Sequence, residues 1–128
     1  MGDKHKITVL LIDDEYDILN TLGKMIELEG WKCLKAPTGE IGLDSLKANE
    51  VDAVVLDVNL PKMDGFSVLK QIRQLKPAMP VVMLTALGYE KDQVERAVAL
   101  GASGYVGKAM PVKTIISKIK TVLGKTGP

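Results

Sequence analysis

The sequence has few of the residues that mark disulfide-bonded, membrane-spanning or strongly charged proteins. Its one cysteine, Cys33, cannot form an internal disulfide and is most simply a small buried hydrophobic residue in a reducing compartment. No apolar run approaches the roughly 20 residues of a membrane span, and the polar first residues lack the apolar stretch of a signal peptide. A net charge of +1 favours neither nucleic acid nor a membrane surface as a partner. We therefore expect a cytoplasmic protein.

Several enzyme motifs are also missing. Gly101, Gly104 and Gly107 have the wrong spacing for a dinucleotide-binding loop. Residues 124–126 (Gly-Lys-Thr) resemble the end of a P-loop, but Ile119 stands where the first glycine is required. There is no Gly-x-Ser-x-Gly motif, and one histidine with one cysteine cannot supply a zinc site.

Five short apolar segments alternate with five amphipathic ones, in a chain of the length of one domain. This alternation predicts an α/β fold with a doubly wound, mainly parallel five-stranded sheet and helices on both faces. Strands are expected at residues 7–12, 31–36, 53–56, 81–84 and 104–107. We expect a single domain over residues 1–128, with a core at about 6–123 and a tail or linker at 124–128.

Helical spacing of apolar residues predicts which side chains the helices bury. The predicted buried faces include Tyr16 in the first helix, Leu75 in the third and Val98 in the fourth. Thr38 is expected to be the N-cap of the second helix, and Pro111 the first residue of the last.

Four of the predicted strands are followed by side chains that can do chemistry. Asp13 and Asp14 follow the first strand, Asp57 the third, Thr85 the fourth and Lys108 the fifth. In an open α/β sheet, ligands bind beyond the carboxyl ends of the strands. We therefore expect these side chains to meet in one crevice.

Three carboxylates in one crevice need a cation, because like charges raise one another's pKa. Oxygen ligands completed by water suit Mg²⁺. An aspartate can also act as the nucleophile of phosphoryl transfer, with Lys108 and Thr85 contacting the phosphoryl oxygens. The pattern predicts phosphate-and-metal chemistry on an aspartate.

Each of these residues also has a simpler interpretation when taken alone. The acidic pair can cap the first helix, and Asp57 can cap a turn. Thr85 can be a strand-end hydroxyl, Lys108 a solvated lysine and Tyr105 a packed strand aromatic. Their joint placement at successive strand ends favours the shared site.

The chain resembles the receiver domain of bacterial two-component response regulators over essentially its whole length, and chemotaxis receivers in particular around Asp57 and Tyr105. The matching elements are Asp13-Asp14, residues 57–65 (DVNLPKMDG), Thr85-Ala86, and residues 101–105 (GASGY) followed by Lys108. This resemblance implies a flavodoxin-like fold with strand order 2-1-3-4-5.

The resemblance also implies the chemistry of the site. Asp57 would accept a phosphoryl group from a phosphohistidine on a sensor histidine kinase or phosphotransfer protein, and Lys108 would contact that group. Mg²⁺, or Mn²⁺ in its place, would be bound by Asp13, Asp14, Asp57 and the backbone carbonyl of Asn59. The domain would catalyse its own phosphorylation and dephosphorylation without being a metabolic enzyme.

By the same resemblance, Thr85 and Tyr105 would connect the site to an output, and Ala86 and Leu87 would affect the phosphoryl group itself. Thr85 would move toward the phosphoryl group and Tyr105 would turn inward, remodelling the face of the fourth helix, fifth strand and fifth helix for a downstream protein or output domain. Small Ala86 would leave room for the phosphoryl group. Apolar Leu87 cannot orient an attacking water by a polar contact, which predicts slow dephosphorylation.

The chain departs from the family at Ala109, which follows Lys108 where the family usually has proline. A cis bond before a residue other than proline costs roughly 3 kcal/mol, so we expect a trans Lys108–Ala109 bond. The competing interpretations are a receiver fold that works without phosphate and a flavodoxin-like cofactor binder. No nucleic-acid or membrane contact is expected from this domain, and the oligomeric state stays open.

Overall fold

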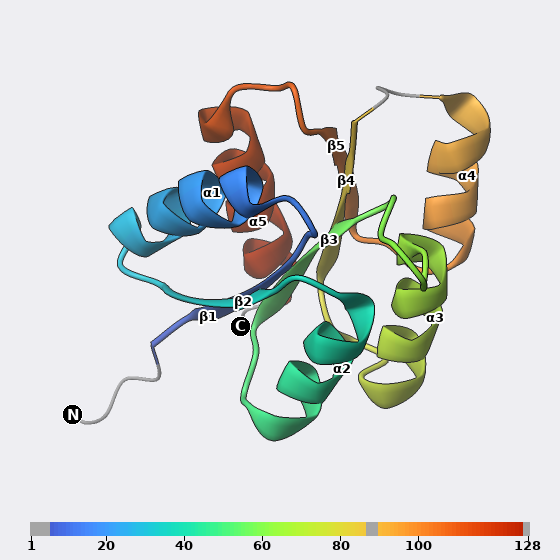
Figure 1. The fold of residues 1–128 in the computed structure, drawn as a ribbon, viewed down its shortest axis with the longest axis horizontal. Helices are drawn as coiled ribbons and strands as arrows, with labels where there is room; N and C mark the ends of the chain where they lie inside the picture. The colour runs from blue at the N-terminus through green and yellow to red at the C-terminus, as the bar shows by residue number, and fades with distance from the viewer. Residues whose placement is uncertain (1–5, 87–89, 127–128) are drawn as a thin grey trace.

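The structure, a computed structural model, describes residues 6–86 and 90–126, in which five strands alternate with five helices (Figure 1). The strands are β1 (Thr8–Ile12), β2 (Lys32–Ala36), β3 (Ala53–Asp57), β4 (Val81–Thr85) and β5 (Gly104–Gly107). The helices are α1 (Tyr16–Leu28), α2 (Gly39–Ala48), α3 (Gly65–Leu75), α4 (Lys91–Ala99) and α5 (Val112–Thr126).

The strands form one parallel sheet in the order β2-β1-β3-β4-β5. Helices α1 and α5 cover one face, and α2, α3 and α4 cover the other (Figure 1). Every residue of β1, β3 and β4 is buried, as expected for short apolar strands with helices on both sides. The predicted α/β class and strand order are confirmed.

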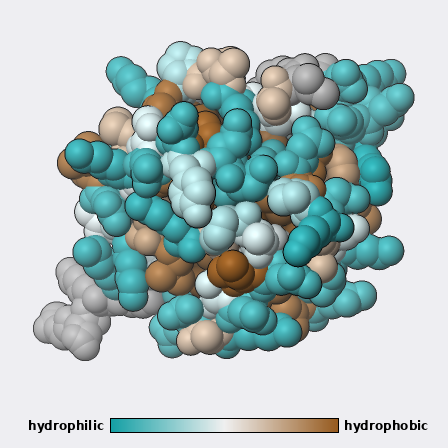
Figure 2. All heavy atoms as spheres, in the orientation of Figure 1, coloured by the Kyte–Doolittle hydropathy of each residue, from teal (hydrophilic) through white to brown (hydrophobic). Residues whose placement is uncertain are grey.

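Each face of the sheet has its own hydrophobic core. Under α1 and α5 the core includes Leu19, Ile26 and Ile119, and under α2, α3 and α4 it includes Leu46 and Leu69. Outside these cores the surface is mostly hydrophilic on the face that Figure 2 shows, with apolar residues in small separate patches. In the described part of the chain, the helices are too short or too polar to span a membrane.

Several predicted helix positions differ from the structure. Tyr16 is 71% exposed and Val98 is 65% exposed, and Leu75 also faces solvent. Tyr16 and Leu75 are the terminal residues of α1 and α3, beyond the packed stretch, and α4 fully buries only Ala97.

The predicted helix ends are partly right. Thr38 is the N-cap of α2, with its hydroxyl oxygen accepting the Ile41 N–H at 3.1 Å. Pro111 lies one residue before α5, and its carbonyl accepts the N–H of Thr114. Helix α5 continues to Thr126, past residue 123, where we expected the core to end.

Gly65 brings the start of α3 against the end of β3. A Cβ at this position would overlap the carbonyl oxygen of Asp57, and the Gly65 N–H donates to the Val58 carbonyl at 2.8 Å. The preceding loop contains Lys62 with φ 65°, a left-handed conformation that costs energy in a residue other than glycine. The backbone around Asp57 is therefore closely confined.

We predict that Gly65→Ala destabilises the protein by about 2 kcal/mol or more, because the added methyl group collides with fixed backbone. Gly124→Ala is the matched control, since a Cβ on this α5 residue meets nothing within 4 Å. That control should stabilise the helix by about 0.5–1 kcal/mol. Urea unfolding measures both, and an unchanged stability of Gly65→Ala would contradict the confinement.

Candidate functional site

The residues of the predicted site lie at the carboxyl edge of the sheet, as the strand pattern predicted. Asp13 directly follows β1, and Asp57 and Thr85 are the last residues of β3 and β4, all three buried. Lys108 follows β5, and its backbone N–H donates to the Thr85 carbonyl at 2.7 Å. Asp14 is exposed beside them.

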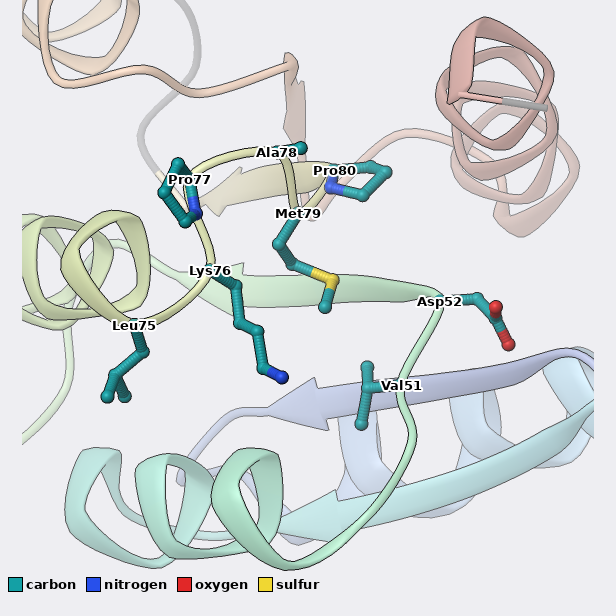
Figure 3. Close-up of a pocket in the computed structure, with 8 residues that line it drawn as sticks. All are labelled: Val51, Asp52, Leu75, Lys76, Pro77, Ala78, Met79 and Pro80. Carbon is teal, nitrogen blue, oxygen red and sulfur yellow. The ribbon is translucent and has the colours of Figure 1, made fainter. Parts of the chain in front are cut away.

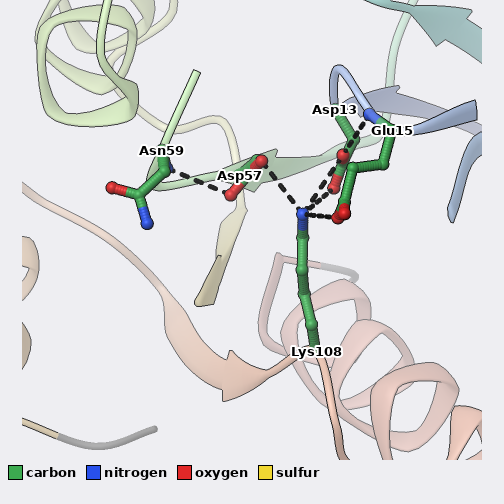
Figure 4. Close-up of polar contacts among 5 residues, drawn as sticks. All are labelled: Asp13, Glu15, Asp57, Asn59 and Lys108. Atoms are coloured by element: carbon green, nitrogen blue, oxygen red, sulfur yellow. Dashed lines mark hydrogen bonds and ion pairs between the residues drawn. The ribbon is translucent and has the colours of Figure 1, made fainter. Parts of the chain in front are cut away.

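The Lys108 ammonium is the centre of the cluster (Figure 4). Its Nζ lies 2.6 Å from Glu15 Oε1, 2.9 Å from Asp13 Oδ2 and 3.0 Å from Asp57 Oδ2. The solvated-lysine interpretation of Lys108 is therefore wrong. Glu15 was not predicted from the sequence, although it directly follows the acidic pair and is the residue before α1.

Two of the aspartates also fix the local backbone. Asp13 Oδ1 accepts the Glu15 N–H at 2.8 Å, and Asp57 Oδ1 accepts the Asn59 N–H at 3.0 Å. Asp57 therefore caps a turn with one carboxylate oxygen and contacts Lys108 with the other. The acidic pair does not cap α1, because the N-cap is Glu15 and its side chain makes no capping hydrogen bond.

Burial shifts the protonation of the cluster. Desolvation and the neighbouring Asp13 raise the pKa of Asp57 from 3.8 to about 6, against the opposing effect of Lys108. Desolvation also raises the pKa of Asp13. Burial works to lower the pKa of Lys108, but hydrogen bonds to Glu15, Asp13 and Asp57 outweigh it and the pKa is raised. The lysine stays charged, while the buried carboxylates are short of positive charge.

The carboxylates fit a divalent cation. One oxygen from each of Asp13, Asp14 and Asp57 lies within 4.8 Å of the others. Asp13 Oδ2 is buried, and apart from the ion pair with Lys108 Nζ at 2.9 Å it has no hydrogen-bond partner among the described residues. An acceptor in this position, beside a second buried carboxylate, is well suited to a hard cation such as Mg²⁺.

An open pocket of about 210 Å³ gives access to the cluster. It is lined by Asp14, Glu15, Asp57, Asn59, Ala86 and Lys108. Ala86 therefore borders this pocket, and its role in leaving room for a phosphoryl group stays a prediction. Leu87 lies outside the described residues.

A larger pocket, of about 370 Å³, lies elsewhere (Figure 3). Its lining includes Val51, Lys76 and Pro80, from the segments that lead into β3 and β4. It is thus at the amino ends of these strands, at the opposite edge of the sheet from Asp57. Size alone does not place the chemistry there.

Tyr105 is buried, and its hydroxyl donates to Gln93 Oε1 of α4 at 3.0 Å. The prediction that Tyr105 is a packed strand aromatic is therefore confirmed.

The described residues contain no cis peptide bond, so the Lys108–Ala109 bond is trans as predicted.

The chain is an open, parallel α/β protein with buried aspartates, a hydroxyl and a lysine at the carboxyl edge of its sheet. In proteins of this class, ligands bind beyond the carboxyl ends of the strands. The profile described as "Response regulator receiver domain" matches residues 9–120. The chain belongs to this family.

Individual relatives agree with this assignment. The chain is 36% identical over 118 residues to the alkaline phosphatase synthesis transcriptional regulatory protein PhoP of Bacillus subtilis, covering 92% of this chain and 49% of PhoP. It is also 36% identical over 118 residues to the transcriptional regulatory protein CpxR of Escherichia coli, covering 92% and 50% of the two chains. The chain therefore spans about half the length of these curated relatives.

A solved structure gives the same result. The CheY-like response regulator receiver domain protein from Methanospirillum hungatei superposes with a TM-score of 0.89 at 26% identity. The match covers 94% of this chain and 96% of that protein.

We predict that Asp57→Asn stabilises the metal-free protein at pH 7 by about 1–3 kcal/mol. The folded chain keeps the Asp57 proton to about pH 6, whereas the unfolded chain loses it near the ordinary pKa of 3.8. The contribution of protonated Asp57 to the free energy of unfolding is therefore lost as the pH rises from 3.8 to about 6. In urea unfolding with EDTA, the gain should fall below about 1 kcal/mol at pH 4. An equal gain at both pH values would contradict this origin.

We also predict that Mg²⁺ raises the unfolding free energy of the wild type, by about 2.7 kcal/mol at one hundred times its dissociation constant. Asp14→Asn should weaken this effect, because it removes an exposed carboxylate of the candidate metal site without disturbing the core. Asp17→Asn, an exposed change in the first turn of α1, is the control. A KCl solution of equal ionic strength that stabilised as well as Mg²⁺ would count against a specific site.

Proposed function

We propose that this receiver domain is a phosphorylation-dependent signalling switch and that Asp57 is its phosphoryl acceptor. The observation that carries the proposal is the buried Asp57 carboxylate, held 3.0 Å from the Lys108 ammonium and beside Asp13 in an open pocket. A carboxylate can attack phosphorus when nearby positive charge offsets the charge of the phosphoryl group.

The proposed donor is a phosphohistidine on a sensor histidine kinase or phosphotransfer protein. An Asp57 carboxylate oxygen forms a bond to phosphorus as the bond from phosphorus to the imidazole nitrogen breaks. The imidazole leaves with that electron pair and takes up a proton. Lys108 exchanges one of its carboxylate contacts for a phosphoryl oxygen, and Thr85 supplies a hydrogen bond.

Asp13, Asp14, Asp57 and the backbone carbonyl of Asn59 would hold Mg²⁺, or Mn²⁺ in its place, whose charge would offset that of the phosphoryl oxygens. The domain would in this way promote its own phosphorylation and dephosphorylation. It would not act on a metabolic substrate.

The proposed output passes through β5. The phosphoryl group on Asp57 would add negative charge and hydrogen-bond acceptors, which would draw Thr85 toward it. The backbone carbonyl of Thr85 accepts the Lys108 N–H, so such a movement would reach the end of β5. Tyr105 and its partner Gln93 then link β5 to α4, so a shift of either residue changes the face made by α4, β5 and α5. This face would contact a downstream protein or an output domain.

We further propose that residues 1–128 act as a single receiver domain, located in the cytoplasm together with its kinase. The relatives named above are transcriptional regulators of about twice this length. We therefore propose that the output of this protein is the control of transcription. The receiver domain itself would make no contact with nucleic acid.

Incubation with Mg²⁺ and acetyl phosphate, followed by intact-mass measurement, tests the acceptor. We expect one added phosphoryl group on the wild type, none on Asp57→Asn, and normal addition on Asp44→Asn, which changes an exposed residue of α2. The gain should disappear with EDTA. A folded wild type that gains no mass would instead favour a receiver fold that works without phosphate.

A further inference from the structure

The Lys108 ammonium has no N–H left for a phosphoryl group. An ammonium carries three hydrogens, and the Nζ atom donates to Asp13, Glu15 and Asp57 (Figure 4). Any new acceptor must therefore displace one of these three carboxylates. The shortest of the three contacts, at 2.6 Å, is the one to Glu15 Oε1.

Glu15 differs from the other two partners. Asp13 and Asp57 are buried and belong to the group of carboxylates that can share a cation, whereas the Glu15 side chain is 57% exposed and is outside that group. Its backbone is fixed, because the Glu15 N–H donates to Asp13 Oδ1. The side chain thus reaches Lys108 from a rigid position while water can replace it.

We propose that Glu15 competes with the phosphoryl group for Lys108 and thereby restrains phosphorylation of Asp57. The inference rests on the function proposed above. Of the three carboxylates on Lys108, the exposed Glu15 is the one that water can replace, so it is the contact that the ammonium gives up for the phosphoryl oxygens. The Glu15 carboxylate also adds negative charge to the pocket wall that an anionic donor approaches.

The test uses the acetyl phosphate reaction, in which an Asp57 oxygen bonds to phosphorus while the bond between phosphorus and the acetate oxygen breaks and acetate leaves. Glu15→Gln keeps the size of the side chain and removes its charge. Exposed ion pairs of this kind are worth little, so we expect the initial rate of phosphorylation to rise about 1.5- to 5-fold.

Asp17→Asn is the matched control, since it makes the same acid-to-amide change two residues away, without an ion pair to Lys108 within the described residues. Its rate should stay within about 1.5-fold of the wild type, as screened surface charges contribute little. Raising KCl from low to high concentration should speed the wild type more than Glu15→Gln, because salt weakens the Glu15–Lys108 pair. Glu15→Ala is a second variant that removes the same carboxylate from the same exposed position. Thermal unfolding checks that each variant is folded.

The outcomes separate the two proposals. A slower Glu15→Gln would mean that Glu15 holds Lys108 in its working position, which overturns the inference and leaves the proposed function intact. An unchanged rate, or an equal rise in Asp17→Asn, would overturn it as well. If the folded wild type is never phosphorylated, the proposed function fails and the inference fails with it.

Discussion

The ion pairs of Lys108 are the interaction on which the site depends. Two buried aspartates at neighbouring strand ends repel each other and lose hydration, and either effect alone raises the pKa of a carboxyl. A single ammonium within about 3 Å of both offsets part of this cost, though not all of it. The remaining deficit of positive charge is what makes the pocket receptive to a cation.

The rest of the fold places that ammonium and those carboxylates together. Parallel strands with helices on both faces bury β1, β3 and β4 completely, so the first polar residues appear where these strands end. Gly65 closes the space beside Asp57, and the hydrogen bond between Thr85 and Lys108 fixes β5 against β4 at the same edge. Packing of the apolar strands thus sets the geometry of a charged site that would be unfavourable by itself.

Much of this site could be predicted from spacing. The four residues Asp13, Asp57, Thr85 and Lys108 were found because an apolar run of strand length ends at each of them. The structure pairs Lys108 with both aspartates and joins its backbone N–H to the Thr85 carbonyl. Glu15 was missed because the rule considers only strand ends, and nothing in the pattern says which way a side chain before a helix turns. The order of the strands came from the family resemblance, since periodicity alone does not specify which strands are neighbours.

The errors in the helices have a related cause. Periodicity identifies an apolar stripe, but it does not say how much of that stripe the sheet covers, so Tyr16 and Val98 were assigned to buried faces and are exposed. The partner of Tyr105 was equally beyond the sequence, because the contact with Gln93 depends on how α4 lies across β5. Contacts made by one side chain across two elements require the structure.

We propose that charge added at Asp57 changes a distant face of the domain. The most direct measurement compares backbone amide NMR spectra of the ¹⁵N-labelled protein before and after phosphorylation in Mg²⁺. The account predicts shifts around Asp57 and Thr85 that continue through Tyr105 into α4, with little change at the far end of α1. Shifts confined to the residues that touch Asp57 would contradict it.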